Sequence, residues 1–269
     1  MAVFLDRDGV IGEANGTPTA HGLAPSCCSH GAAANDPVMK HNLVGGGCSR
    51  EATASVPEHC CPPDASRAAV FVDRDGVLND QTGFVNTPDD FRLLPGAAAA
   101  IRRLNETGIP VVVVTNQGGI ALGYLTEDDL AAIHERMAEL LAAERAHVDR
   151  VYFCPYYPSG TIPRYAKDSP DRKPGIGMFE RARDELGIDL RKSFLVGDAT
   201  TDILAGLRAG CTTILVQTGF AGSDAKVVAE PDFTVKDLPA AVDLILNRLA
   251  DAATRHSQAK AFRSDSLRP

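Results

Sequence analysis

Two aspartates one residue apart, Asp73 and Asp75, follow directly on the apolar run of residues 69–72. Two carboxylates at the end of a buried strand are unfavourable unless their charge is neutralised or used. Asp73 suits the role of a nucleophile that forms a covalent intermediate. Asp75 suits the role of a general acid for the leaving group and then a base for water. The pair predicts phosphoryl transfer through an aspartyl intermediate, although the same pattern also fits a turn after a strand.

Phosphate chemistry also needs hydrogen-bond donors and positive charge at the phosphate oxygens. Thr115 ends a second apolar run, residues 111–114, where its hydroxyl and the following N–H can hold a phosphate oxygen. Lys173, within Arg-Lys-Pro, would add a point charge for the phosphate. We therefore expect Asp73, Asp75, Thr115 and Lys173 to form the catalytic group.

A divalent cation would neutralise the carboxylates of such a site. Mg²⁺ prefers oxygen ligands, keeps several waters and needs only one or two carboxylates. Asp198 and Asp202, in Gly-Asp-x-x-x-Asp, lie one helical turn apart. We expect Asp73 and Asp198 to bind Mg²⁺, whereas Asp202 would hold a water of the metal or orient Lys173. Asp202 also fits a simpler role as an acidic residue near a helix N-terminus.

The composition limits what else the chain can do. Its 269 residues are 44% hydrophobic and carry a formal net charge of −8, which does not attract nucleic acid or an anionic membrane. No apolar run approaches the roughly 20 residues of a membrane span. The first residues lack the pattern of a secretory signal, so the seven cysteines indicate reduced thiols. We expect a cytoplasmic monomer that binds neither nucleic acid nor a membrane.

The elements that must position these residues alternate along the chain from residue 69. Short apolar runs predict strands at 69–73, 110–115, 151–154, 193–197 and 212–216. Apolar spacing, capping residues and glycines predict helices at 95–108, 126–141, 175–187, 199–209 and 237–250. Such a series predicts an α/β fold with a doubly wound, Rossmann-like parallel sheet. Ligands of these sheets bind at the carboxyl ends of the strands, where Asp73, Thr115 and Asp198 fall.

Two flanking segments differ from the predicted phosphatase domain, residues 69–250. Residues 1–68 begin with a copy of the first strand and its aspartates, Asp6 and Asp8, and continue without any aromatic residue after it. Such a segment buries too little apolar area to fold, so we expect a disordered extension with a partial motif duplication. The functional alternative for the copy is a second or exchanged strand. Residues 251–269 are polar and predict a flexible tail.

The order of these motifs resembles the haloacid dehalogenase superfamily of phosphohydrolases. The matching stretches are residues 73–79, 94–97, 115–121, 154–155, 172–174 and 196–198. Within the superfamily they resemble the heptose 1,7-bisphosphate phosphatases, with the histidinol-phosphate phosphatases as near relatives. The resemblance implies the backbone carbonyl of Asp75 as a further metal ligand. We also expect Asn116, Gln117 and Arg172 to bind the substrate.

The lengths of two segments favour members of the superfamily without a cap domain. One segment separates Asp75 from Thr115, and the other separates Cys154 from Lys173. Neither is long enough to hold a domain with a core of its own. An open site of this kind suits a substrate that is held by loops.

Several positions depart from the family pattern. The zinc ligands of the family would fall on Cys154, Tyr156, Ser169 and Asp171. Since only the cysteine is kept, a tetrahedral zinc site is not expected. Leu122 stands where an arginine is usual, and Ala199 stands where a lysine is common. A contact to a distal phosphate would then come from Arg92, Arg164 or Arg172.

The resemblance implies an Mg²⁺-dependent phosphomonoester hydrolase. Its expected reaction removes the 7-phosphate of D-glycero-D-manno-heptose 1,7-bisphosphate, in the biosynthesis of lipopolysaccharide precursors. Hydrolysis of histidinol phosphate is the nearest enzymatic alternative. A non-catalytic scaffold of the same fold is the alternative of another class, and the intact set of Asp73, Asp75, Thr115, Lys173 and Asp198 argues against it.

Overall fold

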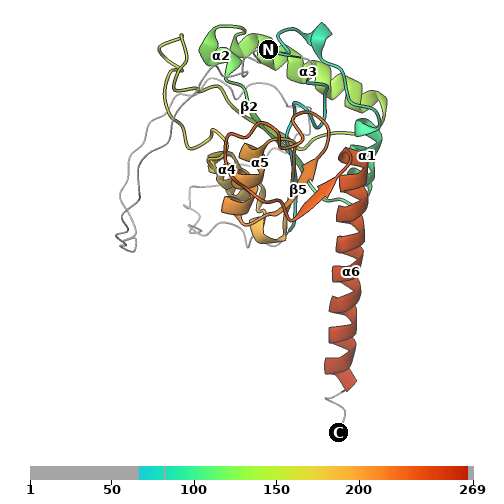
Figure 1. The fold of residues 1–269 in the computed structure, drawn as a ribbon. Helices are drawn as coiled ribbons and strands as arrows, with labels where there is room; N and C mark the ends of the chain where they lie inside the picture. Colours follow the sequence, from blue (N-terminus) through green and yellow to red (C-terminus); the bar gives the residue numbers. More distant parts are fainter. Residues whose placement is uncertain (1–66, 82, 266–269) are drawn as a thin grey trace, which may run out of the picture. The chain divides into compact units, whose positions relative to one another are not determined.

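The computed structural model describes residues 67–81 and 83–265 (Figure 1). The repeated aspartates Asp6 and Asp8 lie outside the described residues, and so does almost all of the expected extension 1–68. Within the described part, no helix combines the length and the apolar character that crossing a membrane requires.

One parallel sheet of six strands forms the centre of the described part (Figure 1). Its strands are β1 (Val70–Val72), β2 (Val111–Asn116), β3 (Arg150–Cys154), β4 (Phe194–Gly197), β5 (Thr212–Val216) and β6 (Phe233–Val235). They lie in the order β3-β2-β1-β4-β5-β6, and each neighbouring pair is parallel. The chain therefore winds outward from β1 in both directions, which confirms the predicted doubly wound sheet.

Helices cover both faces of this sheet. They are α1 (Ala97–Glu106), α2 (Gly119–Leu122), α3 (Glu127–Ala143), α4 (Gly177–Leu186), α5 (Thr200–Ala209) and α6 (Leu238–Asp265), with the short 3-10 helices η1 (Pro88–Asp90) and η2 (Leu190–Lys192). Buried residues of α1, α3 and α6 pack in one core cluster, and those of α4 and α5 pack in another. Because successive strand residues point to opposite faces, Val70 and Val72 join the first cluster and Phe71 joins the second.

Helix α3 shows how the sequence sets the ends of an element. The backbone N–H of Asp129 donates to the Thr126 hydroxyl at 3.1 Å, and the backbone N–H of Thr126 donates to the Asp129 carboxylate at 2.8 Å. This reciprocal pair is the capping box that the sequence predicts. From there Leu130, Ile133 and Met137 follow at helical spacing, and all three are buried.

The predicted strands form with ends shifted by at most one residue. The short helices η1, α2 and η2 were not predicted, and strand β6 and the end of helix α6 also differ from expectation. Strand β6 was not predicted, because three residues are too few to show a strand's alternation of apolar and polar positions. Its residues are also only half-buried or exposed. The flexible tail expected from residue 251 stays a prediction, but the expected helix end near residue 250 is wrong, because α6 includes residues 251–265. That stretch contains no glycine or proline and is rich in good helix formers.

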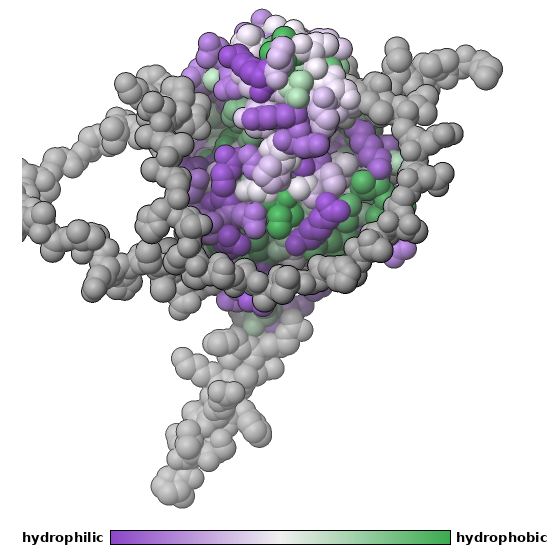
Figure 2. Space-filling model, turned by 90° about the vertical axis from the view of Figure 1, so that its left-hand side faces the viewer, coloured by the Kyte–Doolittle hydropathy of each residue, from purple (hydrophilic) through white to green (hydrophobic). Residues whose placement is uncertain are grey.

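The surface of the described part carries both hydrophobic and hydrophilic residues. On the face shown in Figure 2, hydrophobic residues form small groups among hydrophilic ones. The large hydrophobic residues that are exposed in the described part are Tyr124, Leu207 and Val228. Single exposed hydrophobic residues of this kind are normal on a folded protein and indicate no docking surface.

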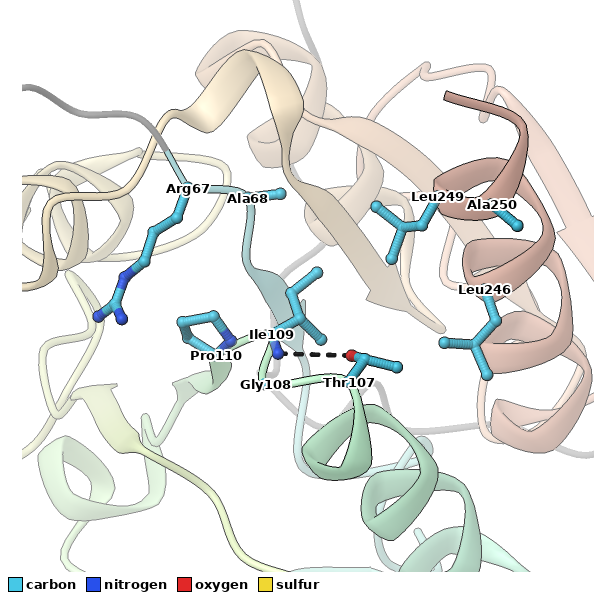
Figure 3. Close-up of a pocket in the computed structure, with 9 residues that line it drawn as sticks. All are labelled: Arg67, Ala68, Thr107, Gly108, Ile109, Pro110, Leu246, Leu249 and Ala250. Atoms are coloured by element: carbon cyan, nitrogen blue, oxygen red, sulfur yellow. Dashed lines mark hydrogen bonds between the residues drawn. The ribbon is translucent and has the colours of Figure 1, made fainter. Parts of the chain in front are cut away.

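The two ends of the sheet carry different features. Asp73, Thr115 and Asp198 lie at the carboxyl ends of β1, β2 and β4. At the amino ends, residues just before β1, of the turn before β2 and of α6 line a groove of about 640 Å³ (Figure 3). In the described residues, only loops and short helices separate β1 from α1 and β3 from α4, which agrees with a capless fold.

Candidate active site

The expected catalytic residues meet at the carboxyl end of the sheet. Asp73 directly follows β1, Thr115 is the next-to-last residue of β2, and Asp198 directly follows β4. Since β1 pairs with both β2 and β4, these three strand ends are neighbours. Lys173 comes from the loop before α4, and Asp202 comes from the first turn of α5. All five side chains are buried.

Lys173 connects the residues on either side of it. Its Nζ lies 2.9 Å from Asp73 Oδ1 and 2.7 Å from Asp202 Oδ1, and it donates to the carbonyl of Val114 at 2.8 Å. These acceptors use the three N–H bonds of the ammonium group. The Asn116 amide donates to the Lys173 carbonyl and accepts from its backbone N–H, both at 3.0 Å. Both ends of the lysine are therefore fixed, although it comes from a long loop.

The titration of the group reflects burial and crowded negative charge. Burial raises the pKa of Asp73 to about 7, with Asp202 adding to the increase and Lys173 opposing it. Burial, Asp202 and Asp73 also raise the pKa of Asp198. For Lys173 the two carboxylates outweigh the effect of burial and raise its pKa, so the lysine stays charged.

Two loops enclose the carboxylate of Asp198. The backbone N–H of Phe220 donates to Asp198 Oδ2 at 2.7 Å. A Cβ added at Gly76 would lie 2.3 Å from the same oxygen, and one added at Gly219 would lie 2.0 Å from it. Both glycines also have positive φ angles, +82° and +60°, which other residues rarely adopt. The Thr218 hydroxyl donates to the Gly76 carbonyl at 2.6 Å and ties the two loops together.

The acidic residues of the site fit a divalent cation. Asp73, Asp198 and Asp202 each offer a carboxylate oxygen, and these oxygens lie within 4.8 Å of one another. One ammonium group, that of Lys173, does not balance three buried carboxylates. An ion with oxygen ligands suits this excess of negative charge. Asp202 is engaged at both oxygens, because Oδ2 also accepts the backbone N–H of Ala199 at 3.1 Å.

Asp75 lies in a separate set of hydrogen bonds. Its carboxylate accepts Nη2 of Arg74 at 2.9 and 3.1 Å and Nδ2 of Asn79 at 3.0 Å. Gln117 Nε2 donates to Asp75 at 2.9 Å and to the Thr115 hydroxyl at the same distance. Gln117 therefore links the expected acid to the expected phosphate-binding hydroxyl.

Arg172 lies beside the loop that follows β2. Its guanidinium carbon is 4.6 Å from the centre of the Tyr157 ring. A Cβ added at Gly118 would lie 3.2 Å from Arg172 Nη1, so the arginine borders the backbone next to Gln117. Contact of Asn116, Gln117 or Arg172 with a substrate stays a prediction.

The positions at which family zinc ligands would fall have other partners. The Cys154 thiol donates to the carbonyl of Tyr156 at 3.8 Å, and burial raises its pKa. Asp171 pairs with Arg181 at 3.1 Å. The Ser169 hydroxyl accepts the backbone N–H of Asp171 at 3.2 Å. The side chains of Cys154, Ser169 and Asp171 and the backbone carbonyl of Tyr156 are thus engaged within the loop or with α4.

Aromatic rings and cations hold the same loop. The rings of Tyr156 and Tyr165 lie 6.0 Å apart, and the Tyr165 hydroxyl donates to Glu127 at the start of α3 at 2.5 Å. Lys167 lies 4.4 Å from the centre of the Tyr156 ring, and Arg164 lies 4.6 Å from that of Tyr165. The loop is thus fastened to α3 through a tyrosine.

Sequence reasoning missed three contributors to the site. Arg74 lies between Asp73 and Asp75, the two aspartates expected to be catalytic, so its position alone could have drawn attention to it. Gly219 follows the carboxyl end of β5, where the rule for ligand binding in parallel sheets applies. His134 of α3 contacts Arg74, and no signal in a single sequence points to that contact.

Comparison with known proteins agrees with this fold. The family model described as "Haloacid dehalogenase-like hydrolase" matches residues 70–153, and the one described as "HAD-hyrolase-like" matches residues 171–241. The first match begins at β1 and includes the paired aspartates, and the second includes Lys173 and Asp198. The chain belongs to the haloacid dehalogenase-like hydrolases, which confirms the resemblance seen in its motifs.

Its relatives within this family carry a more particular name. A D-glycero-D-manno-heptose-1,7-bisphosphate 7-phosphatase of Thermosynechococcus vestitus is 43% identical, over 68% of this chain and 98% of the relative. A D-glycero-beta-D-manno-heptose-1,7-bisphosphate 7-phosphatase of Yersinia pestis is 40% identical, over 68% of this chain and 92% of the relative. The structure of D,D-heptose 1.7-bisphosphate phosphatase from B. bronchiseptica, complexed with magnesium and phosphate, has a TM-score of 0.61 and 34% identity, over 67% of this chain and 99% of that one.

Proposed function

We propose that this chain is a Mg²⁺-dependent phosphatase that removes the 7-phosphate of D-glycero-D-manno-heptose 1,7-bisphosphate. The observation that carries the proposal is the buried Asp73, held by Lys173 next to the carboxylates of Asp198 and Asp202. The relatives named for this reaction match 68% of this chain and support the choice of substrate.

In the first step Asp73 attacks phosphorus, and the bond to the sugar oxygen breaks. Both hydrogen bonds that Asp73 accepts from the described residues, from Lys173 and the Arg74 N–H, end on Oδ1. This arrangement leaves Oδ2 as the attacking oxygen. Asp75 gives its proton to the departing sugar oxygen, Thr115 contacts a phosphate oxygen, and the positive charge of Lys173 offsets the negative charge of the phosphate.

In the second step water attacks the aspartyl-phosphate, Asp75 takes the proton of that water, and the bond from phosphorus to Asp73 breaks. Asp73, Asp198 and the backbone carbonyl of Asp75 would hold Mg²⁺, and Asp202 orients Lys173. When bound, Mg²⁺ offsets the negative charge of the phosphate and of the carboxylates.

The test measures phosphate release with Mg²⁺ from heptose 1,7-bisphosphate and from histidinol phosphate, using the full chain. Asp73→Asn should abolish the release, because an amide is not a nucleophile towards phosphorus. Asp243→Asn is the matched control. Asp243 is an exposed residue of α6 that pairs with Arg103 of α1.

The outcomes separate the alternatives. Preference for the bisphosphate, lost in Asp73→Asn and kept in Asp243→Asn, supports the proposal. Preference for histidinol phosphate would keep the mechanism and overturn the substrate. No release from either substrate, with Asp73→Asn indistinguishable from the parent, would favour a non-catalytic scaffold.

A further inference from the structure

Arg74 is buried to an unusual degree for a charged residue. Its side chain has no exposed surface and is the first by volume among the fully buried side chains of the described part. A buried cation is costly unless every donor finds a partner. Arg74 meets this need through Asp75, which accepts Nε at 3.2 Å and Nη2 at 2.9 and 3.1 Å.

The remaining arm of the guanidinium points to α3. Arg74 Nη1 lies 3.4 Å from Nε2 of His134, and the His134 ring lies 6.1 Å from that of Phe153. Burial and the charge of Arg74 lower the pKa of His134 to about 3, so this ring is neutral and Nε2 can accept. A chain of contacts thus leads from α3 to the carboxyl group of Asp75.

We propose that Arg74 and His134 are positioning residues, in which His134 holds the guanidinium of Arg74 and Arg74 holds the carboxyl group of Asp75 for proton transfer. This inference rests on the proposed function, in which Asp75 is the acid and the base. Neither residue touches the phosphate in this account.

The need for a proton from Asp75 depends on the leaving group of the substrate. A sugar alkoxide leaves only with a proton from Asp75, whereas a nitrophenolate leaves without one. A displaced Asp75 therefore slows the first step for a sugar phosphate and leaves it unchanged for a nitrophenyl phosphate. The ratio kcat/KM reports this step, because it does not include the later hydrolysis of the aspartyl-phosphate.

The experiment compares kcat/KM for heptose 1,7-bisphosphate and for p-nitrophenyl phosphate in the full chain with Mg²⁺. His134→Leu removes the acceptor for Arg74 and should lower kcat/KM for the sugar about 10-fold or more, since small displacements of a catalytic group are costly. Under the same conditions the value for the nitrophenyl ester should change less than about 2-fold. His134→Gln keeps an acceptor oxygen and should restore most of the loss.

Two further variants complete the series. Arg74→Lys replaces a fork of donors by a single ammonium group, so it should show the same selective loss as His134→Leu or a larger one. Tyr152→Phe removes the hydrogen bond to Glu185 at 2.7 Å, on the other face of the sheet, and should leave the ratio of the two substrates unchanged. Thermal unfolding of each variant separates a loss of fold from a loss of positioning.

Equal losses on both substrates in His134→Leu and Arg74→Lys would overturn the inference and make the pair structural. Asp75→Asn tells whether the inference or the proposed function has failed. In one outcome, Asp75→Asn lowers kcat/KM for the sugar alone, whereas His134→Leu and Arg74→Lys show no such selective loss. Only the positioning role then fails. If Asp75→Asn shows no selectivity either, the role of Asp75 as acid fails, and the positioning role fails with it.

Discussion

The two ends of the parallel sheet differ in what they bury. At the carboxyl end, Lys173 contacts Asp73 and Asp202 at 2.9 and 2.7 Å, and Asp198 lies beside these carboxylates; all four side chains are almost closed to solvent. The amino end carries the groove of about 640 Å³, lined by Leu246 and other largely apolar residues (Figure 3).

The lining of this groove does not suit the proposed chemistry. In Figure 3, Ile109 of the turn and Leu246 and Leu249 of α6 point into the space between the two elements. The charged residue among the lining ones, Arg67, donates to the carbonyl of Leu186 at 3.2 Å. The lining holds no carboxylate, and its one hydroxyl, that of Thr107, donates to the carbonyl of Leu104 at 2.7 Å. The proposed active site lies instead where buried charges are held by several partners, at the carboxyl end of the sheet.

The largest effect on activity and stability is expected when the ammonium group of Lys173 is removed from the carboxyl end. Lys173→Met leaves the carboxylates of Asp73 and Asp202 without their shared partner. We expect kcat to fall by about 10²–10³-fold, as for other groups that stabilise charge in the transition state. Without Mg²⁺ at pH 8, the free energy of unfolding should fall by about 3–5 kcal/mol, because a buried charge has lost its partner.

The same variant should recover stability as the pH falls, because Asp73 has a raised pKa and takes up a proton. Urea unfolding at pH 8 and pH 5 measures this recovery. Lys236→Met, at an exposed lysine beside Asp237, is the control and should change neither kcat nor stability appreciably. Equal stability of Lys173→Met and the parent at both pH values would show that the carboxylates need no cation.

A smaller effect is expected from a substitution in the loop after β5, which tests whether this loop positions Asp198. Gly219→Ala would place a Cβ 2.0 Å from Asp198 Oδ2, so the carboxylate or the loop must move. We expect the affinity for Mg²⁺ to fall about 10–100-fold, as when an outer partner of a metal ligand is lost. Calorimetric titration with Mg²⁺ measures it.

The control for this change is Gly210→Ala at the end of α5. Gly210 has a similar positive φ, +80°, but the nearest atom to an added Cβ is Arg191 Cγ at 3.4 Å. Both variants carry the strain of a left-handed backbone, and only one of them touches Asp198. A similar loss of Mg²⁺ affinity in both would show that strain alone, rather than the contact with Asp198, is responsible.

The pH dependence of stability gives a third prediction at the carboxyl end. The pKa of His134 is lowered to about 3 in the folded protein, whereas an unfolded histidine titrates near 6.5. The stability from this group is therefore complete above pH 6.5 and is lost as the pH falls towards 3. In His134→Gln this contribution is absent, so urea midpoints measured from pH 7 to pH 4.5 should fall less steeply than in the parent. Parallel slopes would show that His134 takes up its proton as freely when folded as when unfolded.

The sequence predicted much of this carboxyl end because the positions are set by topology. Asp73, Thr115 and Asp198 follow apolar runs, and parallel strands bring their carboxyl ends together whatever the details of packing. Lys173 was placed by its motif, and its three acceptors follow from the crowding of those ends.

The contacts that depend on helix packing were beyond the sequence. His134 lies 60 residues from Arg74, and only the way α3 packs on the sheet brings the two together. Strand β6 and the extra turns of α6 were missed for a similar reason. Their residues carry weak local signals, and their place in the fold comes from neighbours that a single sequence does not reveal.

The smallest expected effect belongs to the amino end. Leu249→Ser places a hydroxyl in the groove, at a half-buried position on α6. The lost apolar contact should lower the free energy of unfolding by about 1–2 kcal/mol, without reaching the strand ends on the opposite side. Both kcat and KM for the sugar bisphosphate should stay within about 2-fold of the parent, since the change touches no group that holds the phosphate. A large loss of kcat without a loss of stability would show that the groove takes part in the reaction, and the contrast between the two ends would not hold.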